Sequence, residues 1–227
     1  MKDQPETDYT SPNGLLEFTR RYRSDMGGFS SIASAAGFVN NATDDAKGNC
    51  LMSSWVLQGV KQAYCFPLLG TGQATADLWT SSGKRISFGL DASGQPVAPV
   101  NVNERAVRLT DTQGVVTWLV KRDDSAQEIY SASGLLLSRT NVDGKKLTFV
   151  YSDSSTATSV APRAGLLITM KDPFGRALNF QYNEWGVVSK MIDPNGQIYS
   201  YAYGAAGIPC VSGYCEQVTY PGGFVRQ

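Results

Sequence analysis

Residues able to do acid–base or nucleophilic chemistry are sparse in this chain. It contains no histidine, which removes Ser-His-Asp and Cys-His arrangements and the usual general base near neutral pH. Hydrolysis would then depend on carboxylates, and the adjacent pairs are Asp44-Asp45 and Asp123-Asp124. Both pairs stand in polar stretches typical of solvated turns, and nothing in the pattern sets two carboxylates across a cleft, as a glycosidase needs. We therefore predict no catalytic residue and no enzymatic activity.

A phosphate-binding loop is also not indicated. Leu69-Gly70-Thr71-Gly72 has a pair of glycines, but no Gly-Lys-Ser or Gly-Lys-Thr follows it. The glycines of a phosphate loop work together with that lysine and with the start of a helix. We interpret the segment as a turn and predict no cofactor.

The cysteines Cys50, Cys65, Cys210 and Cys215 are open to three interpretations. Local disulfides, Cys50–Cys65 and Cys210–Cys215, fit the even count and would indicate an oxidising compartment. Free thiols are the second interpretation. A zinc site is the third, but it would need all four thiolates in a chain that lacks histidine and the CxxC spacing. We favour the disulfides and predict no metal site.

The overall composition excludes several classes of partner. Lys and Arg number 20 and Asp and Glu number 20, and this balance argues against nucleic acid. No apolar run approaches the roughly 20 residues of a membrane-spanning helix. The first residues are polar and acidic, so we do not expect an N-terminal secretory signal in this chain.

The strongest pattern is an 18-position repeat that occurs three times in the second half of the chain. Each copy opens with a glycine and has another glycine ten positions later, in the pairs Gly134 and Gly144, Gly165 and Gly175, Gly186 and Gly196. The third, fifth and seventh residues after the second glycine are apolar or aromatic: Leu147, Phe149, Tyr151; Leu178, Phe180, Tyr182; Tyr199, Tyr201, Tyr203. A fourth, shortened copy begins at Gly213 and includes Gly223.

One copy of the repeat predicts one β-hairpin. Alternation of aromatic and polar residues is typical of a half-buried strand, and a second apolar run precedes it. Between the two runs stand turns such as Asp172-Pro173-Phe174-Gly175 and Asp193-Pro194-Asn195-Gly196, whose residue order is type I turn chemistry. Because a single hairpin is marginal alone, neighbouring copies must pack together. The sequence thus predicts an all-β fold of antiparallel hairpins.

The aromatic residues of the repeat have two interpretations. Phe149, Phe180 and Tyr201 occupy equivalent positions, so we expect them to point the same way as one continuous ladder in the core. The alternative is an exposed platform that stacks against sugar rings. Trp185 stands in the shortest link between copies and is the best candidate for such a ligand contact.

The third copy resembles a YD repeat of the Rhs family. The family pattern is Tyr-Asp, Gly-Arg-Leu, Asp-Pro-x-Gly and Tyr-x-Tyr, and the stretch from Tyr182 to Tyr203 follows it with Asn183 for Asp and Val187 for Arg. The stretches from Trp118 to Asp143 and from Leu16 to Ser24 are similar to the lead-in and opening segments of such proteins. The resemblance covers roughly residues 12–24 and 78–227.

The resemblance implies a domain organisation. We expect an N-terminal Rhs-type segment with a divergent loop insertion over residues 1–77, a β-rich lead-in over residues 78–133, and YD repeats over residues 134–227. In Rhs proteins the hairpins form a spiralling sheet that closes as a shell around a C-terminal toxin. The shell ends at a self-cleaving Asp-Pro-x-Gly-Leu site, but no leucine follows Gly175 or Gly196, so we expect ordinary turns there.

The resemblance also implies a function. We expect a non-enzymatic structural segment of a bacterial polymorphic-toxin shell, secreted or at the cell surface, in a chain that includes no toxin domain. Its last strand should present an open edge to the rest of a longer shell or to another copy. The alternative is a secreted or cell-surface module that binds carbohydrate or another cell-surface ligand.

Overall fold

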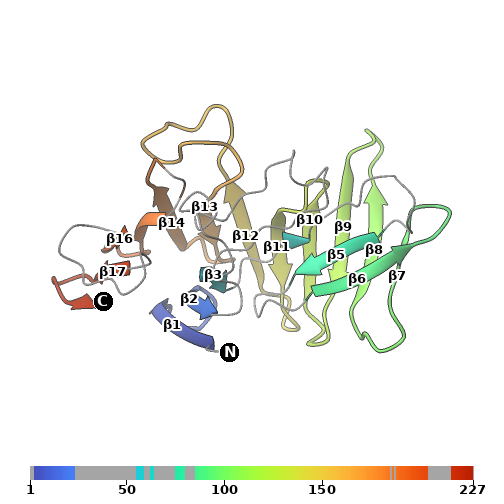
Figure 1. The fold of residues 1–227 in the computed structure, drawn as a ribbon, viewed down its shortest axis with the longest axis horizontal. Coiled ribbons are helices and arrows are strands. Elements are labelled where there is room, and N and C mark those ends of the chain that lie inside the picture. The colour runs from blue at the N-terminus through green and yellow to red at the C-terminus, as the bar shows by residue number, and fades with distance from the viewer. Residues whose placement is uncertain are drawn as a thin grey trace. The chain divides into compact units, whose positions relative to one another are not determined.

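The fold is built from β-strands throughout the part of the chain that can be described. The computed structural model describes residues 3–23, 55–58, 62–63, 75–79, 85–184, 186, 188–203 and 216–226. Within these ranges every regular element is a strand and no helix occurs (Figure 1). Among the described residues, paired strands are antiparallel. The prediction of an all-β fold of antiparallel hairpins is therefore confirmed.

The chain divides into two compact units, residues 1–149 and residues 150–227. The boundary lies within the strand Lys146–Tyr151 of the first repeat copy. The repeat starts ahead of this boundary, at Gly134, so a break in the repeat pattern does not mark the division.

Unit 1 contains three groups of paired strands. A three-stranded sheet consists of β1 (Asp3–Thr10), β2 (Glu17–Arg23) and β3 (Trp55–Gln58). A four-stranded sheet consists of β4 (Gln62–Ala63), β5 (Thr75–Trp79), β6 (Arg85–Leu90) and β7 (Pro96–Val97). A meander of successive neighbours consists of β8 (Arg105–Thr110), β9 (Val116–Lys121), β10 (Gln127–Ser131), β11 (Leu136–Thr140) and β12 (Lys146–Tyr151).

Unit 2 is a second meander in which each strand pairs with the next one in the chain. Its strands are β13 (Leu167–Lys171), β14 (Ala177–Tyr182), β15 (Val188–Ile192), β16 (Ile198–Tyr203), β17 (Glu216–Thr219) and β18 (Val225–Arg226). This connectivity places the β13–β14, β15–β16 and β17–β18 turns at one end of the strands.

One turn type closes most of the hairpins. The N–H of its first residue donates to the carbonyl of the fifth, and the N–H of the fourth donates to the carbonyl of the first. The fourth residue has positive φ, so this is a type I turn followed by a bulge residue in the left-handed region. Turns of this type begin at Asp91, Asp111, Arg122, Ser131, Asn141, Asp172, Asp193 and Tyr220.

The turn residues explain why this geometry recurs. In six of these turns the first residue is Asp, Asn or Ser, and its side-chain oxygen accepts the N–H of the fifth. Glycine serves the fourth position because it has no Cβ to clash at positive φ. The predicted turn glycines have φ between 75° and 89°: Gly134, Gly144, Gly165, Gly175, Gly186, Gly196 and Gly223. Gly213 lies outside the described residues.

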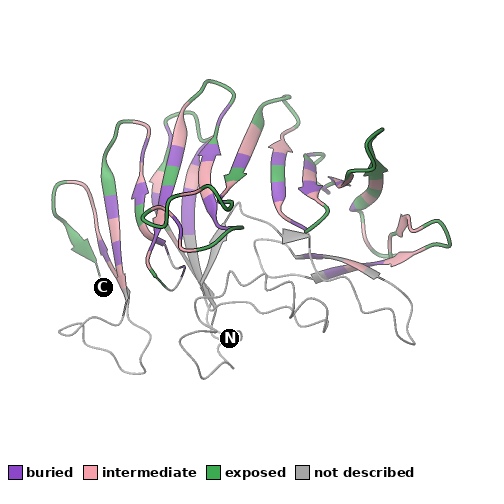
Figure 2. Cartoon of the chain, turned by 90° about the horizontal axis from the view of Figure 1, so that it is seen from above, coloured by how far each residue is buried: buried purple, intermediate pink, exposed green. Residues whose placement is uncertain are grey.

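The core of unit 2 lies on one face of its sheet. Alternate residues are buried and exposed along its strands (Figure 2). The buried face carries Met170, Leu178, Phe180, Tyr182, Met191, Tyr199, Tyr201 and Val218. Burying such side chains stabilises each by roughly 1.5–3 kcal/mol relative to full exposure.

The expected ladder of equivalent aromatic residues does not form a single row across unit 2. Phe180 and Tyr201 share the buried face, but Phe180 pairs with Met191, and Met191 pairs with Tyr199. Tyr201 pairs with Val218 in another row. Equivalent residues of the second and third copies lie 21 positions apart, whereas Phe180 and Tyr199 lie 19 apart. Copies are therefore staggered by two residues across the sheet, because the strand pairing and not the repeat length decides which side chains meet.

The meander of unit 1 has its own buried face. One row across its strands is Ala106, Val120, Glu128 and Arg139, and the next is Arg108, Trp118, Tyr130 and Leu136. Trp118, Val120, Tyr130 and Leu136 are each at most 5% exposed. In Figure 1, β5 and β6 run across β8, β9 and β10. Glu128, in the first row, is a carboxylate with no exposed surface.

Candidate functional site

Five charged side chains of unit 1 form a chain of alternating sign that leads from the surface into the core. Its order is Asp124, Arg139, Glu128, Arg122 and Glu104. The successive N···O distances are 2.7, 3.4, 3.8 and 3.5 Å. The Asp124 side chain is 53% exposed, whereas that of Glu128 is 0% exposed and that of Arg122 is 8% exposed.

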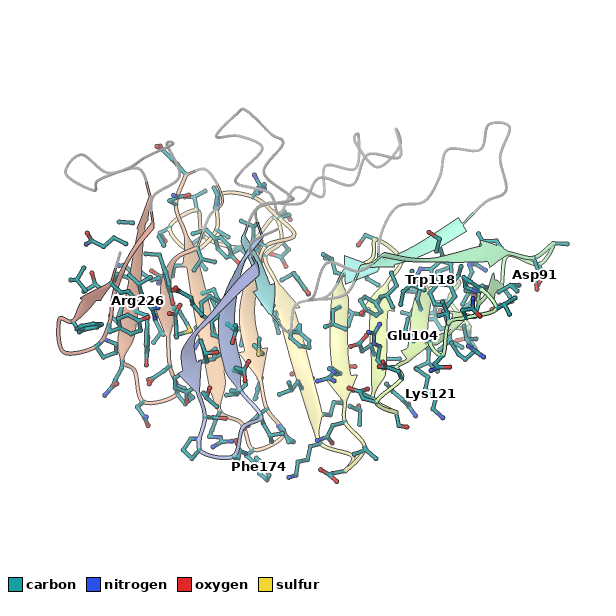
Figure 3. The ribbon with its side chains drawn as sticks, turned by 60° about the horizontal axis from the view of Figure 1, so that its bottom comes forward. Asp91, Glu104, Trp118, Lys121, Phe174 and Arg226 are labelled. Atoms are coloured by element: carbon teal, nitrogen blue, oxygen red, sulfur yellow. The ribbon has the colours of Figure 1, made fainter. Side chains whose placement is uncertain are left out.

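The strands of the meander place these groups. Glu128 lies on the buried face of β10, directly opposite Val120 on one side and Arg139 on the other. Arg122 follows the last residue of β9. Glu104, which is labelled in Figure 3, precedes the first residue of β8. Neighbouring strands lie about 5 Å apart, so side chains on one face come within ion-pair reach.

The turn at Arg122 departs from the common turn chemistry. Arginine replaces the capping Asp, Asn or Ser, and the N–H of Ala126 is accepted by the Asp124 carboxylate instead. Ser125 occupies the glycine position with φ 64°, which is the sole positive φ of a non-glycine residue among the described residues. This turn therefore lacks both the capping side chain and the glycine of the other turns. The Arg122 side chain instead forms ion pairs with the buried carboxylates of Glu104 and Glu128.

The chemistry of the network favours a positioning role over proton transfer. The Tyr130 hydroxyl donates to Glu128 Oε2 at 2.8 Å, and two guanidinium groups lie beside the same carboxylate. Within the described residues, Arg122 Nη1 and Arg139 Nε are buried without a hydrogen-bond partner. The two guanidinium groups compensate the charge of the buried carboxylate, so the network is suited to hold the neighbouring strands in register.

Sequence reasoning missed this network, although it left a trace. The residues Arg122 and Ser125 break the turn pattern, and Glu128 alternates with Tyr130 on the face that should be apolar. The pair Asp123-Asp124, which sequence reasoning did single out, lies in the exposed turn. There Asp123 Oδ1 accepts the N–H of Asp124, while the Asp124 carboxylate bonds Arg139.

The turn at Asp172 is the most heavily bonded one in unit 2. Its buried carboxylate accepts the N–H groups of Phe174 and Arg176 at 2.9 and 3.0 Å and the Arg176 Nε at 2.8 Å. Burial by itself would raise the pKa of Asp172, but the bonds from Arg176 and Phe174 outweigh it and hold the pKa below its ordinary value. The Arg176 guanidinium also lies 5.8 Å from the ring centre of Phe174.

The carboxylate of Asp193 serves its turn in the same way. It accepts the N–H groups of Asn195 and Gln197 at 2.8 and 2.9 Å, so both Asp-Pro motifs are built as turn caps. Phe174 is 66% exposed at the tip of its turn. The hydrogen bond between Arg176 and Asp172 closes the same turn. Phe174 is therefore an exposed aromatic side chain on a turn whose backbone is hydrogen-bonded to the Asp172 carboxylate.

The link between β12 and β13 is the same turn with an insertion. Ser152 donates its N–H to the carbonyl of Leu166 and accepts the N–H of Gly165, as the first and fourth residues of a short turn do. The inserted residues 153–164 fold back, and the carbonyl of Val160 accepts the N–H of Tyr182. A Cβ at Gly186 would lie 3.0 Å from the guanidinium carbon of Arg163. The insertion thus covers the third copy at its opening glycine.

The remaining predicted aromatic sites are buried. Phe149 is 5% exposed, Phe180 1%, Tyr201 5% and Tyr182 6%. The Tyr182 hydroxyl donates to the carbonyl of Leu167 at 2.6 Å, and burial raises the pKa of Tyr182. Tyr151 is half-buried. Tyr203 belongs to β16, and its side chain lies outside the description.

Several predicted sites fall outside the described residues. These are Trp185, Asp44-Asp45, the 69–72 segment and the four cysteines Cys50, Cys65, Cys210 and Cys215. In the part of the chain that the structure covers, no group of three or more His, Cys, Asp or Glu side chains could hold a metal ion. The described ranges also contain no helix that is long and apolar enough to span a membrane.

No protein-family model and no curated protein matches the chain.

Proposed function

We propose that this chain is a non-enzymatic structural segment of an Rhs/YD-repeat shell. The observation that carries the proposal is the recurrence of one hairpin turn, with its capping side chain and left-handed fourth residue, along the meanders of both units. A protein built by repeating one hairpin is stabilised between neighbours and can extend without limit. Such a sheet is suited to enclosing space.

The two faces of unit 2 support this role. One face is buried and aromatic, whereas the other carries a row of mainly polar residues across five strands: Gln181, Lys190, Ser200, Thr219 and Val225. A wall needs one face that packs and one that meets water. On this proposal the chain belongs to a bacterial toxin shell, secreted or at the cell surface, and the enclosed toxin lies outside this chain.

The edge strand β18 is the site where the proposed wall would continue. It has one described neighbour, β17, and Phe224 and Val225 are 67% and 44% exposed. The rings of Tyr199, Tyr220 and Phe224 follow one another at 5.8 and 5.7 Å, so an aromatic row reaches this edge. An exposed strand edge of this kind pairs readily with another strand.

Light scattering after size-exclusion chromatography tests the open edge, with the chain produced under oxidising conditions. We expect association that increases with concentration and is reduced by Val225→Lys, because a charge on an edge strand opposes pairing. Val142→Lys is the matched control, since Val142 is 75% exposed in the turn after β11. A monomer at every concentration would argue against a shell segment and for an autonomous module.

The alternative function is carbohydrate binding, and Phe174 is the observation that favours it. An exposed aromatic ring on a rigid turn costs little entropy to present to a ligand. We expect Phe174→Ala to abolish saturable binding on an array of bacterial and host glycans, with Val142→Ala unchanged. Trp185→Ala should be measured beside it. Binding that survives both aromatic substitutions would remove the carbohydrate hypothesis in this form.

A further inference from the structure

The outer face of the unit 1 meander carries an apolar row at its β8 end. Val107 pairs with Leu119, and Leu119 pairs with Ile129, so three aliphatic side chains lie side by side across β8, β9 and β10. Val107, Leu109 and Val115 are 42%, 41% and 54% exposed. Contiguous exposed apolar side chains on a soluble sheet mark an interaction surface.

The margin of this row carries two adjacent cations. Arg105 and Lys121 are directly opposite each other on the same outer face, an arrangement that is destabilising for like charges. Neither cation has a carboxylate partner within the described residues, and Arg105 Nη1 instead donates to the carbonyls of Val102 and Glu104. Lys121 lies on the outer face of β9, whereas Trp118 lies on the buried face of the same strand; both residues are labelled in Figure 3. An anion supplied by a partner would relieve the repulsion between these two cations.

The other end of the same hairpin carries an acid. Asp111 begins the turn between β8 and β9, and its Oδ1 accepts the N–H groups of Gln113 and Val115. Its second carboxylate oxygen has no partner among the described residues. From Arg105 to Asp111 the strand runs about 20 Å at 3.3 Å per residue. The acids next to Lys121, Asp123 and Asp124, bond within their turn or to Arg139.

The outer edge of β8 is protected at Arg108 by a side chain. The Gln95 side-chain amide donates to the carbonyl of Arg108 and accepts the N–H of Arg108, both at 3.0 Å. One side chain thereby satisfies both backbone groups of Arg108, which protects the middle of this edge against an added strand. The face of the sheet is the more open surface for a partner at this end of unit 1.

We infer that this outer face binds a second copy of the chain, face to face and related by a two-fold axis. A two-fold axis through the middle of the β8–β9 hairpin places Asp111 of one copy at the Arg105 and Lys121 end of the other. The apolar rows of the two copies then cover each other, as in packed sheets. Such a self-complementary surface is the requirement for a two-fold interface. This interface is separate from the β18 edge of the proposed shell.

Sedimentation velocity on a Val225→Lys background measures this face without a contribution from the β18 edge. We expect a monomer–dimer equilibrium whose Kd rises at least about tenfold in Leu109→Glu, since a buried charge at the centre of an interface is costly. Lys121→Glu should raise the Kd similarly by facing Asp111 of the partner. Val142→Glu is the matched surface control and should leave the Kd unchanged.

A conservative variant separates the charge of Asp111 from its turn. Asp111→Asn keeps an oxygen to accept the turn N–H groups, so the hairpin is preserved, and we expect the Kd to rise about two- to fivefold through loss of the ion pair. Carbodiimide cross-linking of mixed light and heavy-isotope chains should join Lys121 of one copy to Asp111 of the other.

Two results would overturn the inference. One is a monomer at all concentrations, and the other is a dimer whose Kd is unaltered by both Leu109→Glu and Lys121→Glu. Neither result bears on the β18 edge, because that edge is blocked in every chain of this series. Circular dichroism on each variant verifies that the sheet is intact.

Discussion

Replacing Glu128 by glutamine should destabilise unit 1 far more than its small change in size suggests. The glutamine retains the shape of the side chain and an oxygen for the Tyr130 hydroxyl, which lies 2.8 Å away. What is lost is the negative charge beside Arg122, whose side chain is 8% exposed, and beside Arg139. Arg122 would then depend on Glu104 alone, at 3.5 Å.

The magnitude follows from the burial of the two groups. Removing one partner of a buried ion pair typically costs about 3–5 kcal/mol, because the other charge stays behind without compensation. An exposed pair contributes about 0–1 kcal/mol, and Asp124, at 53% exposure, supplies that comparison through Asp124→Asn. Since small domains have roughly 5–15 kcal/mol in total, Glu128→Gln should leave unit 1 close to unfolding.

Urea denaturation followed by tryptophan fluorescence measures the effect. Trp118 is 5% exposed and lies directly opposite Tyr130 on the same buried face, so its emission reports the packing around Glu128. Replacing Glu104, Arg122 and Glu128 together by leucine should recover much of the loss, since an apolar core needs no charge balance. The reasoning is refuted if Glu128→Gln costs no more than Asp124→Asn.

Three further predictions concern unit 2. Gly196→Ala should lower the free energy of unfolding by about 1–2 kcal/mol, because Gly196 has a φ of 79° that strains a residue with a Cβ, although the space around that Cβ is open. Gly196→Val should lower it further. Thermal unfolding measures both variants, and an unchanged stability would contradict the hairpin register. Gly186→Ala adds a clash with the Arg163 guanidinium, so it should exceed Gly196→Ala, with the excess absent when Arg163 is alanine. For Asp172, whose folded pKa lies below the ordinary 3.8, ionisation contributes stability above pH 3.8 that is lost as pH falls through the folded value. Asp172→Asn should therefore reduce the loss of stability at low pH, measured as the free energy of unfolding against pH. If the loss at low pH is the same in this variant, Asp172 is not its cause.

The repeat pattern predicted much of the architecture because its information is local. A capping Asp five residues before a strand, followed by a glycine at positive φ, favours a hairpin independently of what packs against it. Gly175 and Asp172 illustrate this, since the turn they form has the predicted residues in the predicted places. The same local logic extends to the turn at Asp111, upstream of the three copies identified from sequence.

The charged network could not be predicted in the same way because its members are distant in sequence. Glu104 and Arg122 each look like a surface residue next to a turn, and only the pairing of β8 with β9 brings them together. Ser125 occupies a backbone conformation that favours glycine, which its residue type does not indicate.

The amino-acid sequence by itself determined the strand class, the turn types and the face of each repeat strand that is buried, because these depend on neighbours a few positions apart. Only the tertiary structure decided which side chains share a row. Phe180 shares a row with Met191 and Tyr199 instead of Tyr201, and Arg105 lies directly opposite Lys121. Register depends on hydrogen bonds between strands and on bulges at their ends, and no spacing within a single strand encodes those.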